Sequence, residues 1–521
     1  MPRPAVAPAV VVVDCGAHTV KAGVAGETNP RVVIPTCTAT VKGQVTKRIG
    51  DQVVELKADP SLVTVLRAHD RGHVTNIACL EAVLSRSFDQ DHLGVTPSSS
   101  SLFMSEALFT PGPVGQAVDE LVFEYYGFQS HARSPCAPWW TSGLAEAHPK
   151  LSAVARGASC SLVVETGFSA TTITPVVCGR VLSPAVRRVD IAGKAMTNYL
   201  KEILSYRQLN VMDDTRTVEH VKEQLAVVSL DFVRDLTQPG RGQQAMFTTR
   251  SPALAQPCTG ANSGVGAGAS TGDGVASEEE PFVCCSSMEA NGEADAAGDV
   301  LMPMRREYVL PDFRARFIGY ARPCVTQQRQ QQDAQTTPEA AAAAAKAAAA
   351  AAAAGSNMTA AADGDEQCLV LENERLATAE LLFNPGDIGL RQAGVSEAVM
   401  QSVFACDEAL RGQLLNNIVV VGGSSKLPNF RHRLFRDVRA SAPSEFSVSV
   451  VAPADPILGA WRGGAALGME PSYFERAVTR AEYDEQGHRV MLQRQHDTCF
   501  WDDLAVGADK PDAMDMYGIM D

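Results

Sequence analysis

The apolar residues near the start of the chain first run together and then alternate with other residues. Residues 10–13 are four consecutive valines, which predict a buried strand. Residues 20–24 place valine, alanine and valine at every second position, which predicts a strand that turns back along the first. Asp14, Cys15 and Gly16 interrupt the apolar pattern between the two runs. The pattern therefore predicts a strand, a tight turn and a second strand.

This predicted hairpin carries the residue types of a site for phosphate and magnesium. Gly16 allows backbone N–H groups to approach an anion closely, Lys21 can reach over the anion, and the Asp14 carboxylate can face a hydrated cation. An ordinary core hairpin can contain the same residues, and a short motif taken alone favours that simpler interpretation.

The hairpin pattern occurs a second time. Residues 161–177 again form an apolar strand, an acidic residue, one spacer, a glycine and a returning strand, with Glu165 and Gly167 at the turn. A third apolar strand ends in Gly422 and Gly423, which suits a close approach of the backbone to a ligand. Together the three segments predict a duplicated α/β scaffold with a nucleotide-sized cleft.

Composition and charge exclude several classes of protein. The chain has 521 residues, a hydrophobic content of 45% and a net charge of −15, so a surface that binds nucleic acid directly is not expected. Its thirteen cysteines include no C-x-x-C pair, which argues against a disulfide framework or a zinc site. The sequence shows no signal peptide and no transmembrane segment.

Helical spacing occurs in several places. Residues 72–88 have helical periodicity with Asn76 as the expected N-cap, and residues 189–236 predict two or three helices. Trp139 and Trp140 lie in a segment with prolines that predicts a loop, where an interface and half-buried packing are both open interpretations.

Two segments are of low complexity. Residues 237–305 are rich in glycine, alanine, serine and acidic residues and predict disorder, because they hold too few large apolar residues to form a core. Residues 326–366 contain glutamines and an alanine tract without an amphipathic face, which predicts a fraying solvent helix.

Several ordered segments resemble one known family. The chain resembles the actin-related proteins, and in particular the sixth subfamily, the nuclear subunit of Swr/SRCAP-type chromatin remodellers. The segments that carry this resemblance are LKEILSYRQLNVMDD (200–214), VKEQLAVVSLDF (221–232), YVLPDF (308–313), LENERLATAELLFNPGDIGL (371–390), IVVVGGSSKLPNF (418–430) and TRAEYDEQGH (479–488).

The resemblance implies an actin-like fold, of the α/β type shared by actin, hexokinase and Hsp70-type ATPases. Two duplicated lobes would enclose the cleft, each with a core and a peripheral subdomain. The implied division is residues 1–36, 73–155 and 459–521 for the first core, 37–72 for its small peripheral subdomain, 156–188 and 384–458 for the second core, and 189–383 for the second peripheral subdomain with both insertions.

The resemblance also assigns residues to the phosphate end of the cleft. Asp14, Gly16 and Lys21 match the first phosphate hairpin of the family, and Glu165 and Gly167 match the second, with glutamate in place of aspartate. Four residues depart from the family pattern: Ala17 and His18 replace serine and glycine, and Phe168 and Thr172 replace an acidic residue and a histidine. Since the last two groups help to position the attacking water, the departures argue against hydrolysis.

At the nucleoside end the resemblance is closer but incomplete. Lys222 and Glu223 match the pair that contacts the nucleoside, and Gly422 and Gly423 match the glycines beneath it. Leu427 stands where an aromatic ring usually lies, and Ile457 where a lysine usually caps the base. Two states stay open: ATP with magnesium held statically, with Asp14 facing the metal, or no cofactor at all.

The resemblance implies a non-catalytic nuclear scaffold subunit of a complex that exchanges a variant histone into nucleosomes. Its expected partners are a motor ATPase and a zinc-HIT subunit, with indirect contact to nucleosomes or histones, no membrane and no filament. A cytoskeletal actin-like ATP-binding protein is the first alternative, and a small-molecule kinase of the same superfamily is the second.

Overall fold

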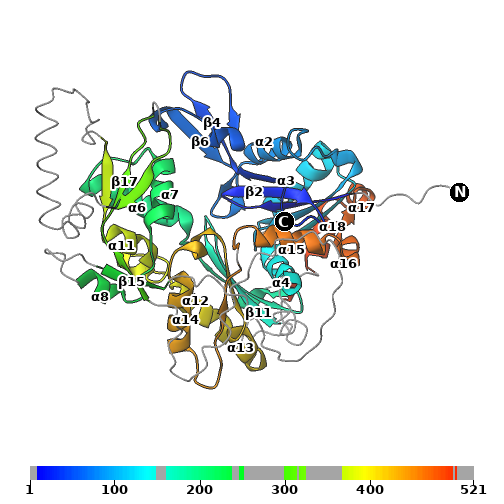
Figure 1. Ribbon diagram of the computed structural model, residues 1–521. Helices are drawn as coiled ribbons and strands as arrows, with labels where there is room; N and C mark the ends of the chain where they lie inside the picture. Colours follow the sequence, from blue (N-terminus) through cyan, green and yellow to red (C-terminus); the bar gives the residue numbers. More distant parts are fainter. Residues whose placement is uncertain are drawn as a thin grey trace, which may run out of the picture.

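The computed structural model describes residues 9–147, 160–237, 246–250, 299–313, 316–323, 366–453, 455–496 and 499–500. Two mixed β-sheets dominate these residues, with α4 (Cys136–Ala147) and α15 (Gly459–Leu467) between them (Figure 1). The first lobe is built on the sheet that contains the first predicted hairpin, and the second lobe on the sheet that contains the second. This is the two-lobed α/β architecture that the sequence predicts.

The sheet of the first lobe has six strands, and its centre is the run of valines at the start of the chain. All four valines are buried, since both faces of the sheet are covered. In order across the sheet the strands are β22 (Val478–Thr479), β10 (Ser130–Pro135), β9 (Ser101–Glu106), β1 (Val10–Cys15), β2 (Thr19–Val24) and β3 (Val32–Pro35).

The sheet of the second lobe has seven strands. Six follow one another across the sheet, and β14 (Arg187–Val189) pairs with β12 beside them. The six are β21 (Val450–Val451), β20 (Ile418–Val421), β11 (Cys160–Thr166), β12 (Thr171–Val177), β13 (Arg180–Leu182) and β23 (Cys499–Phe500).

The two sheets repeat the same topology. β1 pairs antiparallel with β2 and parallel with β9, and β9 pairs parallel with β10. Likewise β11 pairs antiparallel with β12 and parallel with β20, and β20 pairs parallel with β21. The predicted duplication is thus confirmed, and it places the turns of both hairpins at corresponding edges of their sheets.

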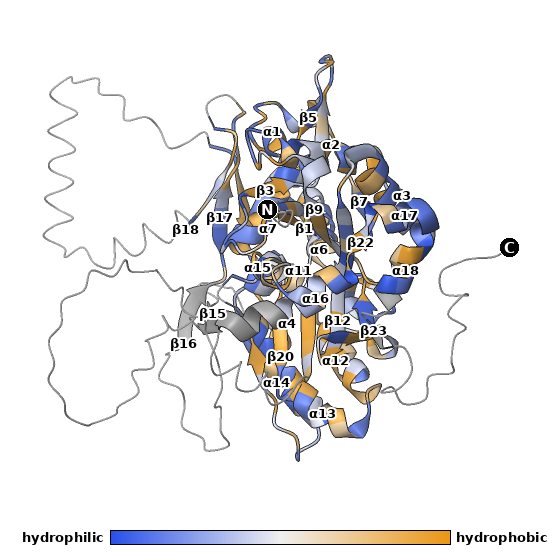
Figure 2. Ribbon diagram, turned by 90° about the vertical axis from the view of Figure 1, so that its right-hand side faces the viewer, coloured by the Kyte–Doolittle hydropathy of each residue, from blue (hydrophilic) through white to orange (hydrophobic). Residues whose placement is uncertain are grey.

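The helices cover the outer faces of the sheets, and Figure 2 shows hydrophobic strands such as β12 and β20 inside and the more hydrophilic α17 outside. Asn76 caps α2 as predicted, since its Oδ1 accepts from the Cys79 N–H at 2.8 Å. On the first lobe the helices are α2 (Ile77–Phe88), α3 (Gly112–Glu120), α16 (Pro471–Arg476), α17 (Arg480–Gln486) and α18 (His488–His496). On the second they are α6 (Gly193–Arg207), α7 (Thr215–Leu225), α8 (Phe232–Thr237), α11 (Glu374–Glu380), α12 (Val395–Phe404), α13 (Glu408–Leu415) and α14 (Phe430–Ser441).

The paired tryptophans lie in a helix, so the prediction of a loop is wrong. Both side chains of Trp139 and Trp140 are buried in α4. Trp139 packs in the apolar cluster against the first sheet, and Trp140 packs in the cluster against the second. Gly464 and Gly459 of α15 leave room for the two rings, because a Cβ at either glycine would overlap an indole. These contacts join the two lobes.

Small sheets lie at the outer ends of both lobes. The small sheet of the first lobe consists of β5 (Arg48–Ile49), β4 (Cys37–Val41) and β6 (Val63–Arg67), with α1 (Asp51–Val54) beside it. A two-stranded ladder of β7 (His69–Asp70) and β8 (His73–Val74) follows. The second lobe carries β18 (Tyr320–Pro323), β17 (Arg306–Val309) and β19 (Cys368–Leu371).

The low-complexity insertions lie largely outside the described residues, as does the predicted alanine helix. For residues 237–305 the prediction of disorder is wrong near both ends, where β15 (Met246–Arg250) pairs antiparallel with β16 (Asp299–Pro303). Among the described helices, none combines the length and the apolar character that a membrane span needs.

Candidate functional site

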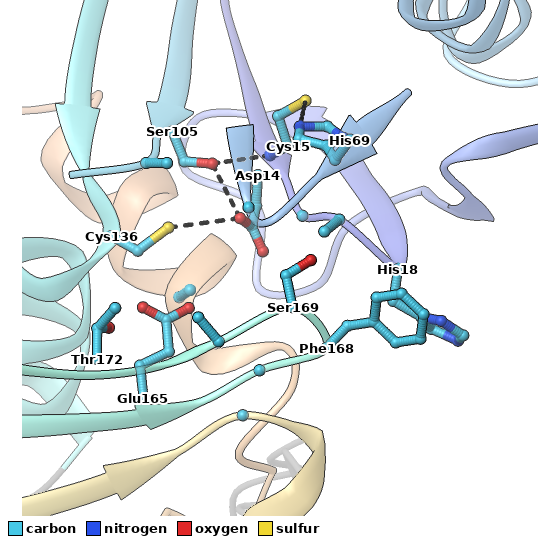
Figure 3. A pocket seen from close by; sticks show the side chains of 18 of the residues that line it. Asp14, Cys15, His18, His69, Ser105, Cys136, Glu165, Phe168, Ser169 and Thr172 are labelled. Atoms are coloured by element: carbon cyan, nitrogen blue, oxygen red, sulfur yellow. Dashed lines mark hydrogen bonds between the residues drawn. The ribbon is translucent and has the colours of Figure 1, made fainter. Parts of the chain in front are cut away.

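A cavity of about 550 Å³ lies between the turns of the two hairpins. Residues of both lobes line it, and Figure 3 shows Asp14 and Glu165 on opposite walls. The nine residues that the sequence predicts for a nucleotide site all line this cavity: Asp14, Gly16, Lys21, Glu165, Gly167, Lys222, Glu223, Gly422 and Gly423. The structure therefore brings the predicted set together, while nucleotide binding by it stays a prediction.

Asp14 and Lys21 form a buried ion pair across the first hairpin. They are cross-strand neighbours in the β1–β2 register, and Lys21 Nζ donates to Asp14 Oδ2 at 2.7 Å. Burial lowers the pKa of Lys21, but the charge of Asp14 and this hydrogen bond outweigh it, so the net pKa is raised. The other oxygen of Asp14 accepts from Ser105 Oγ at 3.0 Å and from the Cys136 thiol at 3.5 Å. Asp14 is thus held by three neighbours.

Glu165 is the corresponding acidic residue of the second hairpin, but its carboxylate has no hydrogen-bond or ion-pair partner among the described residues. Figure 3 shows it pointing into the space beneath Asp14. Burial raises the pKa of Glu165 to about 7, and the nearby charge of Asp14 contributes, while Lys21 opposes the shift. Near neutral pH this carboxyl group is therefore partly protonated.

We expect Glu165 to make the free energy of unfolding fall as the pH rises. The pKa of Glu165 is higher in the folded protein, about 7, than the ordinary value of 4.5, so folding favours the protonated form. The free energy of unfolding therefore falls as the pH rises from about 4.5 to about 7, because the buried carboxyl must then ionise. Glu165→Gln should therefore gain stability relative to the wild type between about pH 5 and about pH 8, by up to about 3 kcal/mol. Urea denaturation at both pH values measures this difference. The exposed Glu485→Gln is the control, and a Glu165→Gln difference that does not change with pH would contradict the assignment.

The tips of both turns carry aromatic rings that face each other. The ring centroids of His18 in the first turn and Phe168 in the second are 5.1 Å apart. Figure 3 shows the two rings lying close together. Burial lowers the pKa of His18, and the charge of Glu219 opposes this shift, so the imidazole is neutral at pH 7. Two of the four departures from the family pattern, His18 and Phe168, are therefore in contact.

The nucleoside end of the cavity is formed by α7 and by the turn after β20. Lys222 Nζ donates to the Gly193 carbonyl at 3.1 Å and to Thr197 Oγ1 at 3.0 Å. Burial lowers the pKa of Lys222, and burial also raises the pKa of its neighbour Glu223. The Lys222 ammonium is thus held by neutral oxygens of α6, with its side chain along the cavity wall.

The two glycines after β20 have different reasons for being glycine. Gly422 has φ +93°, and a Cβ there would lie 2.3 Å from the Thr166 carbonyl oxygen, so the fold itself requires glycine at this position. A Cβ at Gly423 would meet nothing within 4 Å. Of these two glycines, only Gly423 leaves open space above the backbone, and a bound ligand could occupy that space.

Comparison with known proteins identifies the relatives of this chain. A family model described as Actin matches residues 7–496. The chain belongs to the actin family. It is similar to proteins named "Actin-related protein 6": 33% identical to the one from Oryza sativa subsp. indica, over 92% of this chain and 96% of that protein, and 31% identical to the one from Arabidopsis thaliana, over 92% and 97%. The relative from Drosophila melanogaster is 29% identical over 93% and 99%. The expected actin-like fold and the resemblance to the sixth subfamily are confirmed.

The actin fold typically binds a nucleotide in its cleft, and the residues of this chain fit one in part. The nucleoside end fits, because the space above Gly423 is open and Lys222 lines it. The phosphate end does not fit in this conformation, because the rings of His18 and Phe168 meet across the turns. The Gly167 N–H also donates within its own turn, to the Ala170 carbonyl at 3.3 Å. Asp14, Lys21 and Glu165 are the residues that would face magnesium and phosphate if these turns separated.

Sequence reasoning missed Ser105 and Cys136, the residues that hold Asp14 in this actin-family cleft. Burial raises the pKa of the Cys136 thiol well above its usual value, so the thiol stays protonated and donates a hydrogen bond to Asp14 Oδ1. Ser105 lies near the carboxyl end of β9, and Cys136 directly follows β10. A usable signal existed, because the carboxyl ends of parallel strands beside β1 converge on one edge of the sheet.

Proposed function

We propose that this actin-family protein is a non-catalytic scaffold subunit of a nuclear, ATP-dependent chromatin remodelling complex that exchanges a variant histone into nucleosomes. In this proposal its partners are the motor ATPase and a zinc-HIT subunit of a Swr/SRCAP-type complex, and nucleosomes are contacted indirectly. The cleft has a static role, either with ATP and magnesium or without a nucleotide.

The observation that carries the non-catalytic part of the proposal is the make-up of the second hairpin. Thr172 is the cross-strand neighbour of Glu165, and Phe168 occupies the tip of the turn, so neither position offers an acid or base to orient water. The opposite carboxylate, Asp14, is already engaged by Lys21, Ser105 and Cys136. Phosphoryl transfer depends on such positioning groups.

The resemblance supports the chromatin part of the proposal. The segments shared with the sixth subfamily extend over both lobes, and relatives named "Actin-related protein 6" match more than nine-tenths of the chain. A net charge of −15 is also compatible with work close to basic histones.

One observation favours a second candidate function, slow nucleotide hydrolysis. Glu165 lacks a partner among the described residues and has a pKa of about 7, which suits a general base. Its carboxylate points into the cavity (Figure 3).

Experiments on the purified full chain test the proposal. We expect the chain to be a monomer. Its ATP turnover with magnesium should equal that of its Glu165→Gln variant, because the second hairpin lacks the groups that would position water. Turnover that Glu165→Gln abolishes would establish the second candidate instead. From nuclear extract, the tagged chain should capture the motor ATPase and a zinc-HIT protein. Sedimentation as a filament with ATP, or capture of neither partner, would contradict the scaffold role.

A further inference from the structure

Four side chains from four separate elements meet at the mouth of the cleft. His18 lies in the β1–β2 turn, Phe168 in the β11–β12 turn, Arg67 on β6 and Glu219 on α7. The Arg67 guanidinium lies over the Phe168 ring, 4.4 Å from its centroid, and pairs with Glu219 at 3.8 Å. Glu219 also lies 3.5 Å from His18 Nδ1. We call these four residues the latch.

We propose that the latch keeps the cleft closed without a nucleotide and excludes a nucleoside triphosphate from its phosphate end. The latch connects the first lobe, through His18 and Arg67, with the second lobe, through Phe168 and Glu219. In this protein side chains would therefore provide the bridge between the turns that a bound polyphosphate would otherwise form.

The geometry of the two rings explains the exclusion. The turns that carry Asp14-Cys15-Gly16 and Glu165-Thr166-Gly167 match the phosphate hairpins of the family that the chain resembles. With the centroids of His18 and Phe168 5.1 Å apart, no further group fits between the tips. A polyphosphate gripped by both turns would have to separate the rings and lose their contact.

The charge of Arg67 also helps to hold the latch together. The side chains of Arg67 and Glu219 are 24% and 14% exposed, so solvent screens their attraction only in part. The same guanidinium is attracted to the negative face of the Phe168 ring. Loss of Phe168 therefore removes two contacts of the latch at once.

Further contacts around the latch join the same two parts of the molecule. Lys194 of α6 pairs with Asp70 of β7 at 2.9 Å, and Arg216 of α7 donates to the Val54 carbonyl of α1 at 2.6 Å. Arg188 also donates to the backbone carbonyl of Arg71. Each exposed contact is weak on its own, but all of them connect the small sheet and its ladder with the second lobe, and so favour the same closed arrangement as the latch.

Hydrogen exchange on the purified full chain tests whether the latch holds the lobes together. Phe168→Ala should speed exchange about tenfold at residues 16–18 and 63–67, which lie on the opposite lobe, because an aromatic pair and a cation–π pair are lost. The matched control is Phe404→Ala, which removes a ring that lies 5.6 Å from the Arg411 guanidinium within the second lobe. Faster exchange confined to the β11–β12 turn itself would overturn the proposal.

Nucleotide binding tests the exclusion. The double variant His18→Gly, Phe168→Asp removes both rings and should bind a fluorescent ATP analogue with magnesium at least about tenfold more tightly than the wild type. Equal affinity of the two proteins, or no binding by a folded double variant, would overturn the exclusion. If the double variant does not fold, Phe168→Ala alone is measured against the same criterion. Both experiments use the isolated chain, so their outcome is independent of whether the proposed scaffold function holds.

Discussion

Lys21→Met should destabilise the protein by about 3–5 kcal/mol, because it leaves buried carboxylates without their cation. Lys21 and Asp14 are both nearly inaccessible to solvent, and their 2.7 Å ion pair lies in the centre of the cleft. Glu165 faces the same space, so removal of the ammonium leaves two acidic groups close together. The loss should be larger at about pH 8 than at about pH 5, since protonation relieves the repulsion. Urea denaturation at the two pH values measures it.

The double variant Asp14→Asn, Lys21→Met is the matched control for this prediction. Replacing both members of a buried ion pair by neutral groups of similar size is often nearly neutral, so most of the lost stability should return. The single Asp14→Asn variant completes the cycle. If the effects of the two single changes simply add, the ion pair is not coupled and the interpretation is wrong.

Trp139→Ala should also lower the free energy of unfolding by about 3–5 kcal/mol, because it opens a large cavity between α4 and the first sheet. Trp139 is completely buried, and its ring lies 4.6 Å from that of Phe103, centroid to centroid. Gly464 of α15 packs directly on the indole. The surroundings cannot collapse into the space, since a helix and a sheet enclose it. Denaturation with urea measures the loss.

Trp139→Phe separates packing volume from the polar part of the side chain. The indole N–H has no hydrogen-bond partner within the described part of the chain, so phenylalanine loses volume but no hydrogen bond. We expect less than half of the loss caused by alanine. An equal loss in both variants would show that volume is not what Trp139 contributes.

The latch and the buried ion pair suggest different roles for the mouth and the interior of the cleft. Asp14, Lys21 and their neighbours stabilise the interior of the first lobe, while His18, Arg67, Phe168 and Glu219 join the lobes at the mouth. Both sets of contacts are formed by the protein alone. The latch contacts hold the two lobes in one arrangement, as the proposed scaffold role requires.

The hairpins were predictable from the sequence because their pattern is local. Four consecutive valines, an acidic residue, a glycine and an alternating return define β1 and β2, and the same order of residue types defines β11 and β12. Resemblance then located Lys222 and Glu223, which no local pattern marks. The loop predicted for Trp139 and Trp140 was wrong, because tertiary packing outweighed the helix-breaking signal of the nearby prolines.

The strands of the two hairpins, their duplication and the residue types of the two turns follow from the sequence alone, because periodicity and turn chemistry act over a few neighbouring residues. The folded structure is needed to show that Ser105 and Cys136 donate hydrogen bonds to Asp14, that Glu165 has no partner among the described residues, and that Arg67 lies over the Phe168 ring. These contacts join residues about ninety to more than a hundred and twenty positions apart, and no local pattern encodes contacts at such separations.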